Sequence, residues 1–262
     1  MNLMWKKPLS ILTLYVLFSM GLVAERLSVS DAIKTAREQE VLTQQILKDY
    51  CMVGMKNTFN HAEETYQAHI DIFEKNIKIL NNFATSKKAL ENIEKIATFW
   101  EFVKVFLFME KKDWFGALEI KKYMKQIFIL NRETTKIYIS KIGSVEGKYI
   151  NATVNLEVDS QKMAMLYLMH ASWGINTAEM KLEMKSAIEE FSKSVELLKH
   201  TKVNTPQMLK KLQKIEQDLL YFTMMDTLNS RAIPTLIYKK SNMILESARA
   251  LAQVYDKSII MN

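Results

Sequence analysis

The chain has 262 residues, and its 36 lysines and arginines outnumber its 29 aspartates and glutamates, for a formal net charge of +7. The basic residues are spread among acidic ones, without a dense basic block that carries interleaved aromatics, which argues against nucleic-acid binding. Cys51 is the only cysteine, so an internal disulfide is excluded, and we expect its thiol to be buried as a small apolar group.

The N-terminus has the pattern of a secretory signal peptide. Lys6 and Lys7 precede an uncharged run over 9–23, and the small residue Ala24 follows. The run is shorter than the roughly 20 residues that span a bilayer. We therefore expect residues 1–24 to be removed on export to the periplasm, which leaves a charge of +5 (7 − 2). An uncleaved N-terminal anchor in the inner membrane is the alternative.

The remainder of the sequence predicts helices throughout. It is poor in glycine and proline, and apolar residues recur at helical spacing, whereas no segment alternates with a period of two. Capping residues and prolines mark the helix starts. The starts are expected at Ser28 or Ser30, after 54–58, at Thr85 or Ser86, near Gly116, and at Thr177, Pro206 and Pro234. The first three helices should end near 54, 83 and 111–113.

Two segments of the sequence are similar to each other. TQQILKDY at 43–50 aligns with SQKMAMLY at 160–167, a shift of 117 positions (160 − 43). Further on, AHIDIFEKNIKIL at 68–80 aligns with SAIEEFSKSVELL at 186–198. A repeat of this length indicates a duplicated domain rather than a short solenoid unit.

The repeat and the helix pattern together predict an all-α fold of two tandem antiparallel four-helix bundles. Short connections between consecutive helices make neighbours antiparallel. The first bundle should cover 25–145 and the second 146–262, with Gly143 and Gly147 at the boundary. Because glycine weakens a helix only modestly, one continuous central helix shared by both bundles is a second arrangement that the sequence allows.

The repeated segment resembles a known sensory module. The stretch AREQEVLTQQILKDY at 36–50, and more loosely TVNLEVDSQKM at 153–163, resembles the signature of the PilJ-type domain, the N-terminal module of type IV pili methyl-accepting chemotaxis transducers. The resemblance implies an all-helical, extracytoplasmic protein. Related modules in nitrate and nitrite sensor kinases bind their anion at a dimer interface, through an arginine of this segment.

This chain departs from the family pattern at the arginine position, which Glu40 occupies in the first copy and Glu157 in the second. A carboxylate there would repel nitrate. If a pocket persists, we expect a cationic or small polar ligand, contacted by Glu40, Gln44, Glu157 and Gln161. The alternative is that these polar pairs, spaced by four residues, lie on a solvated or inter-helix surface. Tyr50 and Tyr167 should seal the bundle cores, with their hydroxyls at the edge.

Signatures of catalysis and of cofactor binding are absent from the sequence. The four histidines lack the spacing of metal ligands, and we expect them at the surface. There is no glycine-rich phosphate loop and no nucleophile elbow. The sequence therefore predicts no catalytic residue, no metal site and no cofactor.

Two functions remain open. The first is an exported periplasmic sensory or ligand-binding protein of the PilJ-like type, which acts through a membrane receptor or an envelope protein and is able to form a homodimer. Since the sequence stops at Asn262, we expect no transmembrane signalling region of its own. The second is a non-enzymatic structural or protein-interaction module in an envelope assembly, marked by an exposed apolar helix face.

Overall fold

The computed structural model describes residues 28–140, 147–227 and 233–260, and only the backbone of residues 147, 224–227 and 256–260. Every regular element in these ranges is an α-helix. The helices are α2 (Val29–Gly54), α3 (Ala62–Phe83), α4 (Lys87–Leu107), α5 (Trp114–Ile139), α6 (Gly147–Trp173), α7 (Ala178–Lys199), α8 (Pro206–Thr227) and α9 (Pro234–Ile260). The all-α prediction is confirmed. The predicted signal peptide and the predicted domain boundary lie outside the described residues.

Five helices, α2, α4, α7, α8 and α9, begin where the predicted capping residues and prolines place their starts. α5 begins at Trp114 and is capped by Asp113, a residue expected at the end of the preceding helix. Ser28, Ser86 and Thr177 each accept a hydrogen bond from the backbone N–H three residues on, which satisfies a donor that the helix leaves unpaired. Pro206 and Pro234 are the first residues of α8 and α9. None of the described helices has the length and apolar character that crossing a membrane requires.

One predicted helix end is wrong. α4 ends at Leu107, before the predicted 111–113. The ammonium of Lys112 donates to the carbonyl oxygens of Leu107 and Met109, at 2.7 Å each. The bond to Leu107 satisfies a carbonyl that the last turn of the helix leaves without a helical partner, and the bond to Met109 holds the turn that follows.

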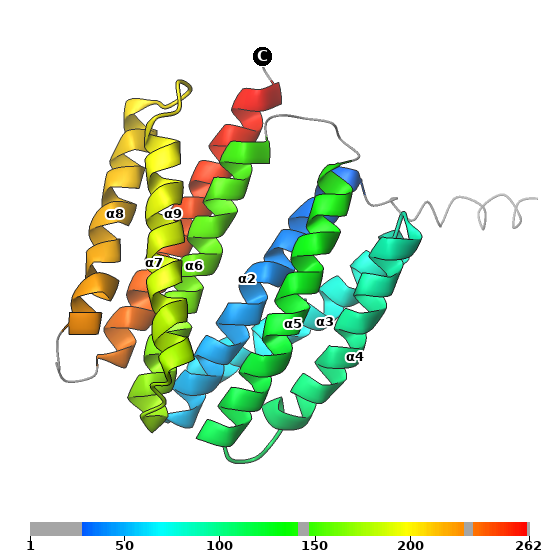
Figure 1. Cartoon of the computed structure of the whole chain (residues 1–262), viewed down its shortest axis with the longest axis vertical. Coiled ribbons are helices and arrows are strands. Elements are labelled where there is room, and N and C mark those ends of the chain that lie inside the picture. Colours follow the sequence, from blue (N-terminus) through cyan, green and yellow to red (C-terminus); the bar gives the residue numbers. More distant parts are fainter. Residues whose placement is uncertain (1–27, 141–146, 228–232, 261–262) are drawn as a thin grey trace, which may run out of the picture.

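The helices form two groups that lie side by side (Figure 1). In the first helix group, α2–α5, α2 packs against α3 and α5, and α5 packs against α4. In the second helix group, α6–α9, α6 packs against α7 and α9, and α8 contacts both of those helices. The groups meet along α2 and α6, which we call the seam.

α2 and α6 run parallel along the seam. Arg37 bonds to Asn151 near the start of both helices, and the hydroxyl of Ser172 donates to the carbonyl of Cys51 near their ends. α5 is antiparallel to α2, because Thr135 near its end donates to Glu40. α5 and α6 are therefore antiparallel to each other, and the arrangement with one continuous central helix is wrong.

The core extends across the seam. One buried cluster combines residues of α2–α5 with Met165, Leu166 and Met169 of α6 and Tyr238 of α9. A smaller cluster at the seam contains Val41 and Val158, which are 117 positions apart, with Phe128 packed against it. Cys51 lies in the larger cluster, fully buried, as predicted, and burial raises the pKa of its thiol well above the usual range.

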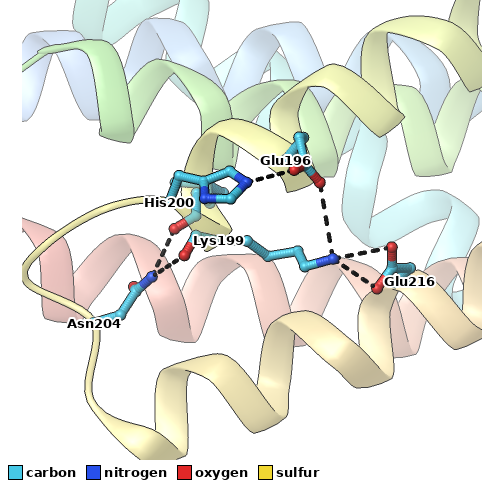
Figure 2. Close-up of polar contacts among 6 residues, drawn as sticks. Glu196, Lys199, His200, Asn204 and Glu216 are labelled. Atoms are coloured by element: carbon cyan, nitrogen blue, oxygen red, sulfur yellow. Dashed lines mark hydrogen bonds and ion pairs between the residues drawn. The ribbon is translucent and has the colours of Figure 1, made fainter.

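The turn between α7 and α8 is fixed by polar contacts (Figure 2). Asn204 donates to the carbonyls of Leu198 and Lys199 at the end of α7, and accepts from the hydroxyl of Tyr255. The capping side chain of α8 is Thr205, whose hydroxyl accepts from the N–H of Met208 at 3.3 Å. Figure 2 also shows Lys199 bridging two glutamates, an exposed contact that contributes little to stability.

Candidate functional site

Glu40 and Glu157, the glutamates of the repeated segment, are buried and paired with arginines. A carboxylate oxygen of Glu40 accepts from the hydroxyl of Thr135 at 2.9 Å and lies 3.7 Å from Nε of Arg132. A carboxylate oxygen of Glu157 accepts from Nε of Arg249 at 3.2 Å. The arginines are themselves 117 positions apart (249 − 132), so the pair is repeated in both helix groups.

Burial raises the pKa of both glutamates, to about 7 for Glu157, while the arginines act in the opposite direction. A buried carboxylate without such a partner would be costly. The two glutamates therefore connect α2 to α5 and α6 to α9. Neither of them lines the cavity described below.

The neighbouring hydroxyl and amide side chains also repeat their contacts. Thr43 donates to the carbonyl of Glu40 at 2.7 Å, and Ser160 donates to the carbonyl of Glu157 at 2.9 Å. The amide nitrogen of Gln44 donates to Thr43 at 3.0 Å, and that of Gln161 donates to Ser160 at 3.3 Å. Each glutamine is thereby oriented alike, with its carbonyl oxygen free to accept from another group.

Tyr50 and Tyr167 repeat a third contact. Their hydroxyls accept from the backbone N–H of Asp113 at 3.1 Å and of Ile233 at 2.9 Å, at the starts of α5 and α9. Tyr50 is fully buried, and Gly116 leaves room for its hydroxyl, since a Cβ there would lie 2.3 Å from it. The tyrosines thus fix the first turn of the last helix in each group.

A cavity of about 300 Å³ lies at the seam, between α2, α5, α6 and α7. Gln44 and Thr43 line it from α2, so one of the two predicted glutamines lies in its wall. Its apolar lining residues include Leu47, Met124, Phe128, Ile129, Val158 and Met165. Its charged lining residues are Lys121, Lys125, Arg132, Asp159, Lys162, Glu183 and Glu190. A volume of this size suits a small organic molecule.

Most of the positive charge around the cavity is already compensated. Glu183 of α7 lies 2.7 Å from Nζ of Lys121 and 3.3 Å from Nζ of Lys125, both of α5. Arg132 faces Glu40. These contacts also join the two helix groups across the mouth of the cavity.

Asp159 is the carboxylate of the cavity that lacks such compensation. Among the described residues it makes no hydrogen bond and no ion pair within 4 Å. Burial raises its pKa to about 7, against the lowering effect of Lys162 and Arg132 and with a small raising effect of Glu190. It could therefore bind a cationic group.

The opposite side of the seam holds a buried lysine. Nζ of Lys48 donates to Oε1 of Gln161 at 2.5 Å and to Oδ1 of Asn242 at 2.6 Å, and lies 4.1 Å from the ring centroid of Tyr238. Asp49 supplies the nearest negative charge, held by the hydroxyl of Tyr238 at 2.8 Å and by His69 at 2.5 Å. Burial lowers the pKa of Lys48 to about 8.

Sequence reasoning missed Arg132, Arg249, Lys48 and Asp159. The two arginines could have been found, since they stand at the same shift of 117 as the glutamates. The expectation of surface histidines is wrong for His69, whose side chain is 19% exposed and bonded to Asp49. In the ranges that the structure describes, no group of histidine, cysteine, aspartate and glutamate side chains could hold a metal ion.

Comparisons with protein-family models, with curated proteins and with solved structures find no match to this chain. The functional argument therefore rests on the geometry of the seam and on its repeated contacts.

Proposed function

We propose that the chain is a PilJ-like periplasmic sensory or ligand-binding protein, built from two tandem four-helix bundles, whose ligand site is the cavity at the seam. One observation carries this proposal: a cavity of about 300 Å³ with Gln44 of the signature segment in its wall. Polar groups converge on it from both helix groups, as in a small-molecule site.

The repeated contacts support the tandem arrangement. The pairs Glu40–Arg132 and Glu157–Arg249 join the first and last helix of each group in the same way. Tyr50 and Tyr167 fix the last helix of each group by the same kind of bond. Duplication of one bundle would account for both sets of contacts. The glutamates, the arginines and the tyrosines are all shifted by 117, whereas the backbone partners of the tyrosines, Asp113 and Ile233, are shifted by 120 (233 − 113).

The position of the cavity supports the sensory role. The resemblance to PilJ-type modules implies a ligand site at an interface between two copies of the signature segment. Here α2 and α6 carry the two copies and lie in parallel against each other. The seam within one chain would take the place of the interface between two subunits.

Ligand binding at this place can alter the packing of the two groups. The walls of the cavity include α5 of the first group and α7 of the second, joined by Lys121, Lys125 and Glu183. A ligand that contacts both walls would favour one spacing of α5 and α7 over others, since it shifts a population only by binding one state better. A membrane receptor or envelope protein would read that spacing.

A thermal-shift screen of the full-length chain tests the proposal. The panel contains nitrate, nitrite, amino acids, amines and divalent cations. A true ligand raises the melting temperature in a saturable way. The Ser186→Trp variant should abolish the shift, because Ser186 is exposed and lines the cavity. Ser192→Trp is the matched control, exposed on the same helix outside the cavity. A shift that survives Ser186→Trp, or no shift at all, contradicts the proposed site.

Export is tested separately. We expect the chain in the periplasmic fraction, with a mature N-terminus at Glu25 after removal of residues 1–24. Mass spectrometry of the intact protein distinguishes this from an uncleaved N-terminal anchor. Recovery of the uncleaved chain in the cytoplasmic fraction would contradict export.

An exposed aromatic patch favours a second candidate function, that of a protein-interaction module in an envelope assembly. Phe102, Phe108, Trp114 and Phe115 are 48–59% exposed on α4, on the turn after it and on the first residues of α5. Phe115 contacts Trp114 and Phe106, with ring centroids 6.0 Å apart in each case, and exposed apolar side chains that gather in this way mark interaction sites. A photo-crosslinker at Phe108 should then capture an envelope protein or a second copy, whereas one at exposed Phe59, outside the patch, should not. Equal capture at both positions would count against this function.

A further inference from the structure

The buried ammonium of Lys48 has a counterpart position in the cavity. The groups around Nζ of Lys48 are Gln161, Tyr238, Ser241 and Asn242. Subtracting 117 from each number gives Gln44, Lys121, Met124 and Lys125, and adding 117 to Lys48 gives Met165. All five counterparts line the cavity. The cavity and the Lys48 site are therefore the two repeats of one site.

Both the Lys48 site and the cavity have a glutamine whose side-chain oxygen can accept a hydrogen bond from an ammonium group. Oε1 of Gln161 accepts from Lys48, while the amide nitrogen of the same side chain donates to Ser160. Gln44 has its amide nitrogen bonded to Thr43 in the same way. Its carbonyl oxygen is thus the counterpart of the oxygen that accepts from Lys48. Met165, which stands where Lys48 would, brings no ammonium into the cavity.

Each side also has its own carboxylate. Asp49 lies beside Lys48, and its counterpart in the second copy is the apolar Leu166. Asp159 faces the cavity, and its counterpart in the first copy is the apolar Leu42. Lys121 and Lys125, which replace Tyr238 and Asn242, are compensated by Glu183. A cation in the cavity would therefore meet Gln44 and Asp159 while both lysines of α5 are paired, and Lys162 of α6 is the cavity lysine that makes no ion pair with a described residue.

We propose that the cavity binds a short aliphatic primary amine, whose ammonium group contacts Gln44 and Asp159 as that of Lys48 contacts Gln161 and Asn242. The lysine side chain is itself a butylammonium group, so it is the template for the ligand. The apolar residues Leu47, Met124 and Met165 would contact the alkyl chain. This inference rests on the proposed function of the cavity, and names its ligand class.

Calorimetric titration of the full-length chain with n-butylamine tests the proposal, with n-butanol and butyrate as matched neutral and anionic probes. We expect saturable binding of one n-butylamine, and no binding of butyrate. Asp159→Asn should weaken n-butylamine about tenfold or more, since it removes the opposite charge. Glu189→Gln is the matched control, with the same change of charge on the exposed face of α7 outside the cavity. It should leave the affinity unchanged.

The Lys48→Ala variant provides a second and independent test. Removal of the lysine side chain beyond Cβ vacates the space of a propylammonium group in the repeated site, so that two n-propylamine molecules should bind instead of one. In the double variant Lys48→Ala/Ser186→Trp, which blocks the cavity, one should remain. If Lys48→Ala does not fold, the comparison of Asp159→Asn with Glu189→Gln decides alone.

Two negative outcomes are distinguishable. If n-butylamine does not bind, but nitrate, butyrate or another small molecule does so and Ser186→Trp abolishes that binding, the amine is wrong and the cavity remains a ligand site. If no compound of the panel binds, the amine and the proposed function both fall.

Discussion

The two sides of the seam share a framework and differ in what fills it. On the side of α5 and α7, Met165 leaves a cavity that Asp159 lines. On the side of α3 and α9, the ammonium of Lys48 lies among Gln161, Asn242 and Tyr238. The glutamate–arginine, hydroxyl–carbonyl and tyrosine–amide contacts are of the same kind in both groups. A few side chains therefore separate a site that the chain fills itself from one that is open.

The largest effect should come from the glutamine that holds the buried ammonium. Gln161→Leu leaves Lys48 without its 2.5 Å acceptor and also removes a bond to the carbonyl of Ser241. We expect a loss of about 3 kcal/mol in the free energy of unfolding, measured by urea denaturation. The counterpart change Gln44→Leu, in the wall of the open cavity, should cost less than about 1 kcal/mol. Equal losses would show that the two sides do not differ in this way.

The free energy of unfolding should depend on pH through the ionisation of Lys48. Its pKa is lowered to about 8 by burial, and Asp49, with Tyr238 and His69 bonded to it, opposes this only in part. Between that pKa and the higher one of the unfolded chain, the unfolded state binds more protons, so stability rises with pH. The expected contribution of Lys48 between pH 7.5 and 9.5 is a gain of about 2 kcal/mol, measured as the difference in pH dependence between the unaltered chain and Lys48→Met.

Lys48→Met, which copies Met165, should remove this alkaline gain in urea denaturation at the two pH values. A gain that is unchanged in Lys48→Met would assign it to other groups. The buried thiol of Cys51 and the buried tyrosines Tyr50 and Tyr255 have raised pKa values, so they lower the stability as these groups ionise in the unfolded chain. Lys48→Met leaves that loss in place, so the comparison of the two chains isolates the lysine.

Much of the fold could be predicted because helix ends are encoded locally. Ser86 and Thr177 cap the helices that their positions predict, and prolines open α8 and α9. The direction of α6 could not be predicted in this way. It depends on the apolar seam with α2, where Val41 meets Val158, and not on the residues of the connection.

The candidate site could be predicted only in part. The repeat pointed to Gln44 and Gln161, which the structure places in the cavity wall and at Lys48. It could not show which contacts each face of α2 makes, because every residue of 39–52 is buried and α2 packs against three helices. A lysine on a helix normally lies in solvent, so Lys48 gave no signal from its residue type alone.

The third prediction concerns the affinity of the open side for n-butylamine. With a pKa of about 7, Asp159 is largely protonated at pH 6 and ionised at pH 8. Lys162 of α6 and Arg132 of α5 lower the pKa of Asp159, and Glu190 of α7 raises it slightly. The residues of α2 that line the cavity are uncharged. A cationic ligand favours the ionised form, so its affinity should rise about tenfold from pH 6 to pH 8.

Calorimetry at both pH values measures this rise, and Asp159→Asn should abolish it. A rise that persists in Asp159→Asn would have to come from another group. Falling affinity over the same range would contradict cation binding at Asp159.

The smallest expected effect is the difference in the free energy of unfolding between the variants Tyr50→Phe and Tyr167→Phe. Tyr50→Phe deprives the N–H of Asp113 of its acceptor in a place closed to water, and should cost about 1–2 kcal/mol. Tyr167→Phe frees the N–H of exposed Ile233, which water can reach, and should cost less than about 0.5 kcal/mol. Urea denaturation of both variants measures the difference.

Gly116→Ala sharpens this comparison, since its new Cβ would lie 2.3 Å from the Tyr50 hydroxyl and 3.3 Å from the ring carbon that carries it. The buried ring cannot move away freely, so the variant should be destabilised by about 1–3 kcal/mol, as overpacked sites are. In the Tyr50→Phe background the closer contact is gone, and the added cost of Gly116→Ala should fall. Additive costs would mean that the hydroxyl does not set the size of residue 116, and that the first turn of α5 is held by Asp113 alone.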